Sequence, residues 1–143
     1  MDRKVVLVVE DNKDELMIYT TLLSYRGYAI LAAADFDTAL QIARESSPDL
    51  AVVDVNLGDP NRDGCDLIVA LREASGERRL PIIAHTAFGD VYRNSLERVG
   101  CDSIIHKPTN PQVLLQAIEQ LIGPPGPPGT GSGALPDSPT RNE

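Results

Sequence analysis

The chain has 143 residues, of which 42% are hydrophobic and 24% are charged, a composition typical of a globular domain rather than a disordered chain. Its 21 acidic and 13 basic residues give a net charge of -8 at pH 7, and without a dense cluster of Lys and Arg we expect no direct binding to nucleic acid. The two cysteines indicate reduced thiols, and the longest purely apolar run, Val5–Val9, is too short for a membrane span and precedes no signal-peptide pattern, so we expect a cytoplasmic protein.

Short apolar runs alternate with amphipathic segments from residue 1 to about residue 122. These runs have the length of strands, and the lack of alternation in most of them is typical of strands buried on both faces. The predicted strands, in chain order, are residues 4–9, 28–33, 49–53, 81–85 and 103–106.

Each predicted strand is followed by a segment that we interpret as a helix, on the basis of apolar spacing and of end signals. The predicted helices are about residues 13–26, 35–46, 66–74, 90–99 and 110–122. Several begin after a residue that can cap a helix, and the candidate caps are Asn12 or Asp11, Asp35 or Asp37, and Asn110 or Thr109.

Five buried strands that alternate with helices predict an α/β fold with a parallel sheet covered on both faces. Right-handed crossovers leave few topologies, and we expect the flavodoxin-like (βα)5 order 2-1-3-4-5. The domain is expected to span residues 1–122. Residues 123–143 differ in composition, because 11 of these 21 residues are Gly or Pro, and they are expected to form a flexible tail.

Polar residues follow four of the predicted strands at the point where each strand ends. Glu10 and Asp11 follow the first strand, Asp54 the third, Thr86 the fourth and Lys107 the fifth. In the order 2-1-3-4-5 these four strands are lateral neighbours, and ligands of open parallel sheets bind beyond the carboxyl ends of the strands. We therefore expect the five side chains to converge on one shallow site.

Three carboxylates in one site repel each other by about 4 kcal/mol per pair at 4 Å and an effective dielectric of 20. Mg²⁺, or Mn²⁺ in its place, would relieve this repulsion, and Lys107 can neutralise a phosphoryl oxygen or a carboxylate. Asp54 can attack phosphorus to give an acyl phosphate. Taken singly, Asp11 would more often be a helix cap than a ligand, and Lys107-Pro108 would more often be a surface turn; the combination in strand order is what indicates a site.

Over about residues 3–122 the sequence resembles the receiver domains of bacterial two-component response regulators. The motifs that carry this resemblance are Val8-Val9-Glu10-Asp11-Asn12, Val52-Val53-Asp54-Val55-Asn56-Leu57, Asp63-Gly64, Thr86-Ala87, Gly100-Cys101-Asp102 and Lys107-Pro108. The resemblance implies that Asp54 is the phosphoacceptor. It also implies that Asp11, Asp54 and the backbone carbonyl of Asn56 are magnesium ligands, with Glu10 acting through water.

The same resemblance implies that Thr86 is a switch hydroxyl that turns toward the phosphoryl group, that Lys107 contacts that group, and that a cis peptide bond precedes Pro108. Two features depart from the family pattern. Ile104 stands where the family usually has an aromatic ring that rotates during switching, and the loop at residues 58–62 is about two residues longer than usual.

The function implied is a single-domain, CheY-like response regulator in a phosphorelay. A histidine kinase or a histidine phosphotransfer protein would phosphorylate it. The phosphorylated domain would bind a protein target through the face formed by the fourth helix, the fifth strand and the fifth helix, or would pass the phosphoryl group on. We expect a monomer or weak homodimer that assists its own phosphorylation and dephosphorylation but is not an enzyme.

Two other functions are compatible with parts of the sequence. A pseudo-receiver, which binds partners without being phosphorylated, is favoured slightly by Ile104 and the longer loop, but it gives no reason to keep repelling carboxylates together. A magnesium phosphatase resembling the haloacid dehalogenase family would need an Asp-x-Asp pair, whereas this chain has Asp54-Val55-Asn56.

Overall fold

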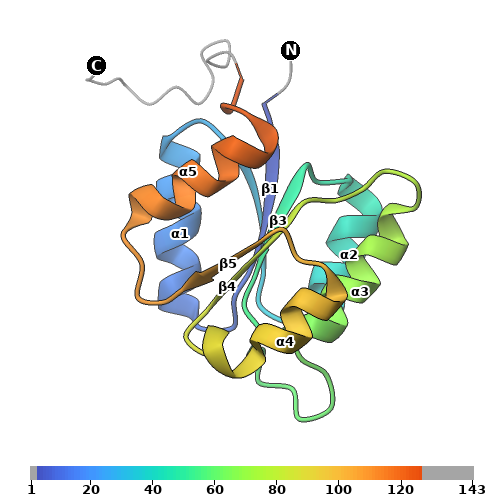
Figure 1. The fold of residues 1–143 in the computed structure, drawn as a ribbon. Helices are drawn as coiled ribbons and strands as arrows, with labels where there is room; N and C mark the ends of the chain where they lie inside the picture. Colours follow the sequence, from blue (N-terminus) through green and yellow to red (C-terminus); the bar gives the residue numbers. More distant parts are fainter. Residues whose placement is uncertain (1–2, 127–143) are drawn as a thin grey trace.

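A computed structural model describes residues 3–126 of the chain (Figure 1). Five parallel strands form one sheet in the order β2-β1-β3-β4-β5, so the predicted flavodoxin-like topology is confirmed. The strands are β1 (Val5–Val9), β2 (Ala29–Ala33), β3 (Leu50–Val53), β4 (Ile82–Thr86) and β5 (Ser103–His106). The helices are α1 (Lys13–Tyr25), α2 (Phe36–Ser46), α3 (Gly64–Ser75), α4 (Gly89–Val99) and α5 (Pro111–Ile122).

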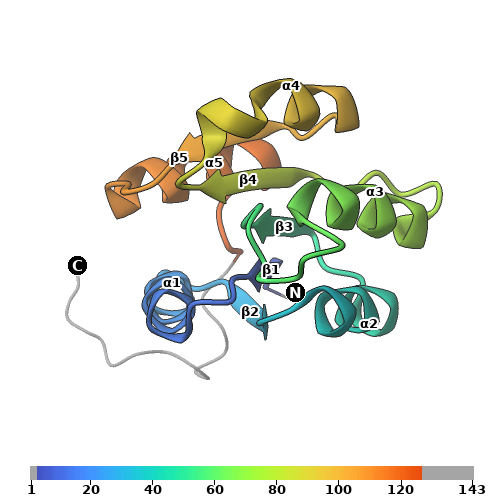
Figure 2. The same ribbon diagram turned by 90° about the horizontal axis from the view of Figure 1, so that it is seen from below.

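Helices cover both faces of the sheet, with α1 and α5 on one face and α2, α3 and α4 on the other (Figures 1 and 2). Strand alternation divides the core accordingly: Val6 and Val8 of β1 pack on the α1 side, whereas Leu7 and Val9 pack on the α2 side. Burial of each such side chain contributes about 1.5–3 kcal/mol. The rigid layers that result fix the positions of the strand ends.

Local capping explains where α1, α2, α3 and α5 begin. Of the alternative caps, the side chains of Asn12, Asp35 and Asn110 accept the backbone hydrogen bonds. The third helix begins two residues earlier than predicted, because Asp63 and Asp66 form a capping box that includes Gly64 in the first turn.

The fourth strand runs one residue later than predicted at both ends. Pro81 has no N–H to donate to a neighbouring strand, and β4 begins at Ile82. At its other end Thr86 pairs in register with His106 of β5. Thr86 is therefore the last residue of the strand itself.

The first residues of the expected tail pack against the domain. The hydroxyl of Tyr28 donates to the carbonyl oxygen of Gly123 at 3.0 Å, and the N–H of Lys4 donates to the carbonyl oxygen of Pro125 at 2.9 Å. The rest of the expected tail, residues 127–143, lies outside the described residues. Within residues 3–126, no helix combines the length and the apolar character needed to cross a membrane.

Candidate functional site

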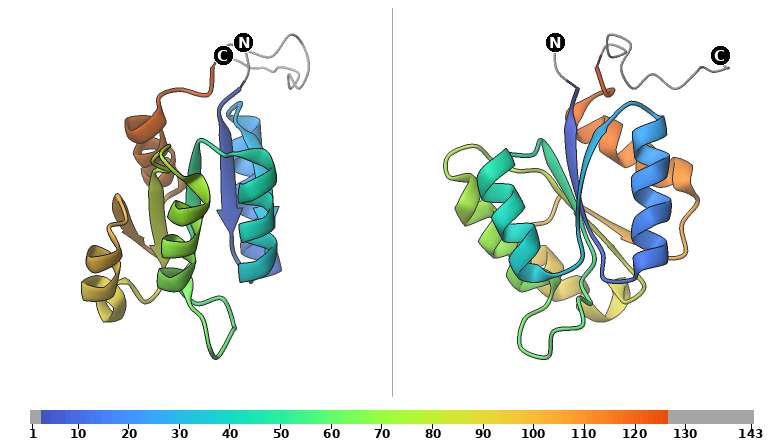
Figure 3. Two further views of the ribbon diagram at one scale, coloured as in Figure 1. Left: turned by 90° about the vertical axis from the view of Figure 1, so that its right-hand side faces the viewer. Right: turned by 180° about the vertical axis from the view of Figure 1, so that it is seen from behind.

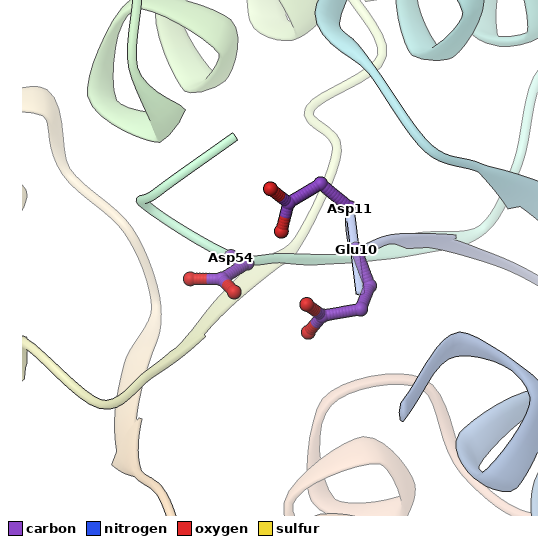
Figure 4. Close-up of side chains that lie close together, drawn as sticks. All are labelled: Glu10, Asp11 and Asp54. Atoms are coloured by element: carbon purple, nitrogen blue, oxygen red, sulfur yellow. The ribbon is translucent and has the colours of Figure 1, made fainter. Parts of the chain in front are cut away.

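Three carboxylates meet at the carboxyl ends of β1 and β3. One oxygen each from Glu10, Asp11 and Asp54 lies within 4.8 Å of the other two, and Figure 4 shows the three groups gathered at these strand ends. Glu10 is 3% and Asp54 8% exposed, whereas Asp11 lies at the surface. The structure thus brings together three groups that the sequence placed on neighbouring strands.

The backbone holds two of these residues in place. The N–H of Glu10 donates to Ala33 at 3.0 Å and the N–H of Asp54 donates to Val9 at 3.0 Å, so both continue the pairing of the sheet. Behind Asp54, the chain passes so close at Gly64 that a Cβ there would lie 2.5 Å from the carbonyl oxygen of Asp54. The Asp63-Gly64 motif is therefore explained by close packing against the phosphoacceptor candidate.

The ammonium of Lys107 lies among carboxylates. Its Nζ donates to Oε1 of Glu10 at 2.5 Å and to Oδ2 of Asp54 at 3.1 Å. It also forms an ion pair with Oε1 of Glu15 at 2.7 Å. Sequence reasoning missed Glu15, because an acidic residue in the first turn of a helix is common and usually does no more than complement the helix dipole.

Burial shapes the acid–base properties of this cluster. Burial raises the pKa of Glu10 to about 7; the hydrogen bond from Lys107 opposes that shift and the charge of Asp54 adds to it. Burial alone would lower the pKa of Lys107, but its contacts with Glu10, Glu15 and Asp54 outweigh that effect and raise it. Lys107 therefore stays an ammonium.

The donor set fits a hard divalent cation. All three clustered side chains offer oxygen, and the single ammonium of Lys107 leaves the cluster with an excess of negative charge. Asn56 lies two residues beyond Asp54, and its N–H donates to Oδ1 of Asp54 at 3.1 Å. The backbone carbonyl of Asn56 remains a predicted ligand of the cation.

Thr86 and Ile104 lie on β4 and β5, the two strands that follow β3 in the sheet. Thr86 is fully buried, and its Oγ1 accepts a hydrogen bond from the N–H of Phe88 at 3.1 Å. Ile104 is partly buried against the core on the α2 side and pairs with Ala84, so no ring lies at this position. The Lys107-Pro108 bond is cis, as the resemblance implied.

The longer loop between β3 and α3 protrudes beyond the strand ends (Figure 3). Arg62 holds it to the start of α2, donating to both carboxylate oxygens of Asp37 at 2.9 and 3.2 Å and to Asp59 at 3.0 Å. The guanidinium also lies 4.1 Å from the ring centroid of Phe36. Sequence reasoning missed Arg62, because its partner Asp37 lies 25 residues away.

Comparison with known proteins decides the family. A family model described as the response regulator receiver domain matches residues 6–119. The chain belongs to this receiver family. The polar-differentiation response regulator DivK of Brucella anthropi is 32% identical over 123 residues, which cover 84% of this chain and 97% of that protein. The protein is therefore a DivK-like receiver domain of two-component systems.

Solved receiver structures agree with the fold. The chemotaxis protein CheY4 of Vibrio cholerae is 28% identical, with a TM-score of 0.75, over 83% of this chain and 98% of that one. The receiver domain of the sensor histidine kinase PA1611 of Pseudomonas aeruginosa PAO1 is also 28% identical, with a TM-score of 0.75, over 84% of this chain and 98% of that domain. That structure has a magnesium ion coordinated in its active site cleft.

Proposed function

We propose that this receiver domain accepts a phosphoryl group on Asp54 in a reaction that requires Mg²⁺ or Mn²⁺. The observation that carries the proposal is the pairing of Asp54 with both a carboxylate cluster and a buried ammonium. A nucleophilic carboxylate, a cation site and a donor for phosphoryl oxygens are the three parts that such a reaction needs.

The cation would be held by Glu10, Asp11 and Asp54, together with the backbone carbonyl of Asn56. It would neutralise charge that develops on the phosphoryl oxygens. Glu10 is buried and engaged with Lys107, which favours a role through water rather than direct ligation.

In the transfer step, an oxygen of Asp54 forms a bond to phosphorus while the bond from phosphorus to the donor breaks. With phosphohistidine on a kinase or phosphotransfer protein as donor, that bond is P–N, and its electron pair stays on the imidazole. Lys107 moves from the carboxylate of Asp54 to a phosphoryl oxygen, and Thr86 donates its hydroxyl to another. Attack by water on the acyl phosphate later returns the carboxylate and inorganic phosphate.

The output is a change in protein contacts, or onward transfer of the phosphoryl group. Helices α4 and α5 each carry an exposed apolar side chain, Val91 at 78% and Val113 at 48% exposure, and such side chains would suit contact with a protein target. Phosphorylation would shift the population of conformations on the face formed by α4, β5 and α5.

Acetyl phosphate with Mg²⁺ tests the proposal, because it supplies the phosphoryl group without a partner protein. Intact mass and phosphate-affinity electrophoresis should show one hydroxylamine-sensitive phosphoryl group on the wild type and none on Asp54→Asn. Asp14→Asn removes an exposed carboxylate of α1 and serves as the matched control. Equal labelling of wild type and Asp54→Asn would overturn the assignment.

A further inference from the structure

The ammonium of Lys107 has a carboxylate partner that the proposed reaction does not use. Of its three close carboxylates, Glu10 and Asp54 stand at strand ends, whereas Glu15 reaches it from the first turn of α1. The Lys107 side chain is only 11% exposed, so its N–H groups are directed into the protein. Glu15 therefore forms an ion pair, although not a hydrogen bond, with the ammonium that contacts the phosphoacceptor.

Glu15 is itself held by backbone contacts. Its N–H donates to Oδ1 of Asn12 at 3.0 Å, and the N–H of Asn12 donates to Oε2 of Glu10 at 3.2 Å. Glu10, Asn12, Glu15 and Lys107 thus form a closed ring of polar contacts beside Asp54. Oε1 of Glu15 is buried although 37% of the side chain is exposed, and it accepts no hydrogen bond, so the carboxylate reaches inward and acts on Lys107 through its charge.

We propose that Glu15 is a positioning residue that holds the ammonium of Lys107 toward the phosphoryl group on Asp54. This inference rests on the proposed function of Asp54. A lysine has a long flexible stem, and a second anchor beside Glu10 reduces the number of directions available to its ammonium. When Lys107 leaves the carboxylate of Asp54 for a phosphoryl oxygen, Glu10 and Glu15 keep it within reach.

The test measures the rate of phosphorylation by acetyl phosphate and Mg²⁺ in wild type, Glu15→Ala and Glu15→Gln. Glu15→Ala should be slower by about threefold to fivefold, the size expected when a partly exposed ion pair is lost. Glu15→Gln keeps the shape of the side chain but removes its charge, so it should be slowed to a similar extent if the ion pair with Lys107 positions the ammonium. Asp14→Ala removes the neighbouring acid of the same turn and should leave the rate unchanged.

A double-variant cycle with Lys107→Ala separates positioning from other roles. If Glu15 acts through Lys107, Glu15→Ala should have no further effect in the Lys107→Ala background. A role in the stability of α1, or a general repulsion of the anionic donor, would persist in that background and would overturn the inference. Stabilisation by Mg²⁺ should be unchanged in Glu15→Ala, because Glu15 is not in the clustered trio.

The two proposals fail differently. A wild-type chain that takes no phosphoryl group contradicts the proposed function. Normal labelling of wild type together with equal rates for Glu15→Ala contradicts only the role of Glu15. An increase in the rate of Glu15→Ala would also overturn it, since it would show that the carboxylate hinders transfer.

Discussion

Replacement of Asp11 by Asn should change stability in opposite directions with and without Mg²⁺. In EDTA the wild-type cluster carries mutual repulsion among Glu10, Asp11 and Asp54, and the substitution removes part of it. With Mg²⁺ the same carboxylate becomes a ligand, and the variant loses the binding energy that the wild type gains. A surface residue with a purely structural role would not show this reversal.

The distances set the size of the effect. Two unit charges at the 4.8 Å limit of the cluster repel by about 0.9 kcal/mol in water and about 3.5 kcal/mol at an effective dielectric of 20. Asp11 is exposed, so the lower value applies, and Lys107 offsets part of the repulsion. We expect Asp11→Asn to be more stable in EDTA by about 1 kcal/mol, which raises Tm by about 4 °C in a domain of this size.

Thermal unfolding in EDTA and across a Mg²⁺ titration is the assay. At ten times its Kd, Mg²⁺ should stabilise the wild type by about 1.4 kcal/mol and the variant by much less. Asp14→Asn carries the same charge change outside the cluster and should respond to Mg²⁺ like the wild type. The reasoning is refuted if Asp11→Asn is less stable than wild type in EDTA, or if Mg²⁺ stabilises both equally.

Two further predictions concern stability. Gly64→Ala should cost about 1–3 kcal/mol in urea unfolding, because its Cβ would overlap the backbone at Asp54 and Val55, and a cost below about 0.5 kcal/mol would contradict the packing. Burial lowers the pKa of His85 to about 4, so the stability that neutral His85 contributes is lost as pH falls from 6.5. Burial raises the pKa of Glu10 to about 7, so the stability that protonated Glu10 contributes is lost as pH rises from 4.5. These two pH dependences offset each other in the wild type. Without metal, the free energy of unfolding of Glu10→Gln, measured by urea unfolding, should fall by up to about 3 kcal/mol between pH 6.5 and pH 4. The double variant Glu10→Gln with His85→Leu should show no such fall.

Much of the fold could be predicted because it depends on repeated local signals. Continuous apolar runs mark strands that are buried on both faces, and right-handed crossovers then restrict the order of the sheet. Helix starts were predicted less well where loop and helix share residue types. Asp63-Gly64 has the composition of a turn, and only the spacing from Asp63 to Asp66 indicates the capping box.

The site was predicted to the extent that it lies on the strands. Glu10, Asp11 and Asp54 converge because parallel strands end at one edge of the sheet. Glu15 and Arg62 were missed for a different reason. Each reaches its partner across the fold, Lys107 in one case and Asp37 in the other, and no periodicity in the sequence records such contacts.

Ile104 supplies no ring for an aromatic switch, and the contacts of Thr86 offer a route from the phosphorylation site to the surface that needs none. Phe88 is the N-cap residue of α4 and its side chain caps nothing, whereas its N–H donates to Oγ1 of Thr86. If Thr86 turns its hydroxyl toward a phosphoryl group, that bond is strained or lost, and the start of α4 is freed. We therefore expect the amide of Phe88 to exchange hydrogen faster when beryllofluoride and Mg²⁺ mimic the phosphorylated state. Unchanged exchange at Phe88, in a protein that binds beryllofluoride, would contradict this route, because the hydrogen bond from Phe88 to Thr86 would then be retained in the phosphorylated state.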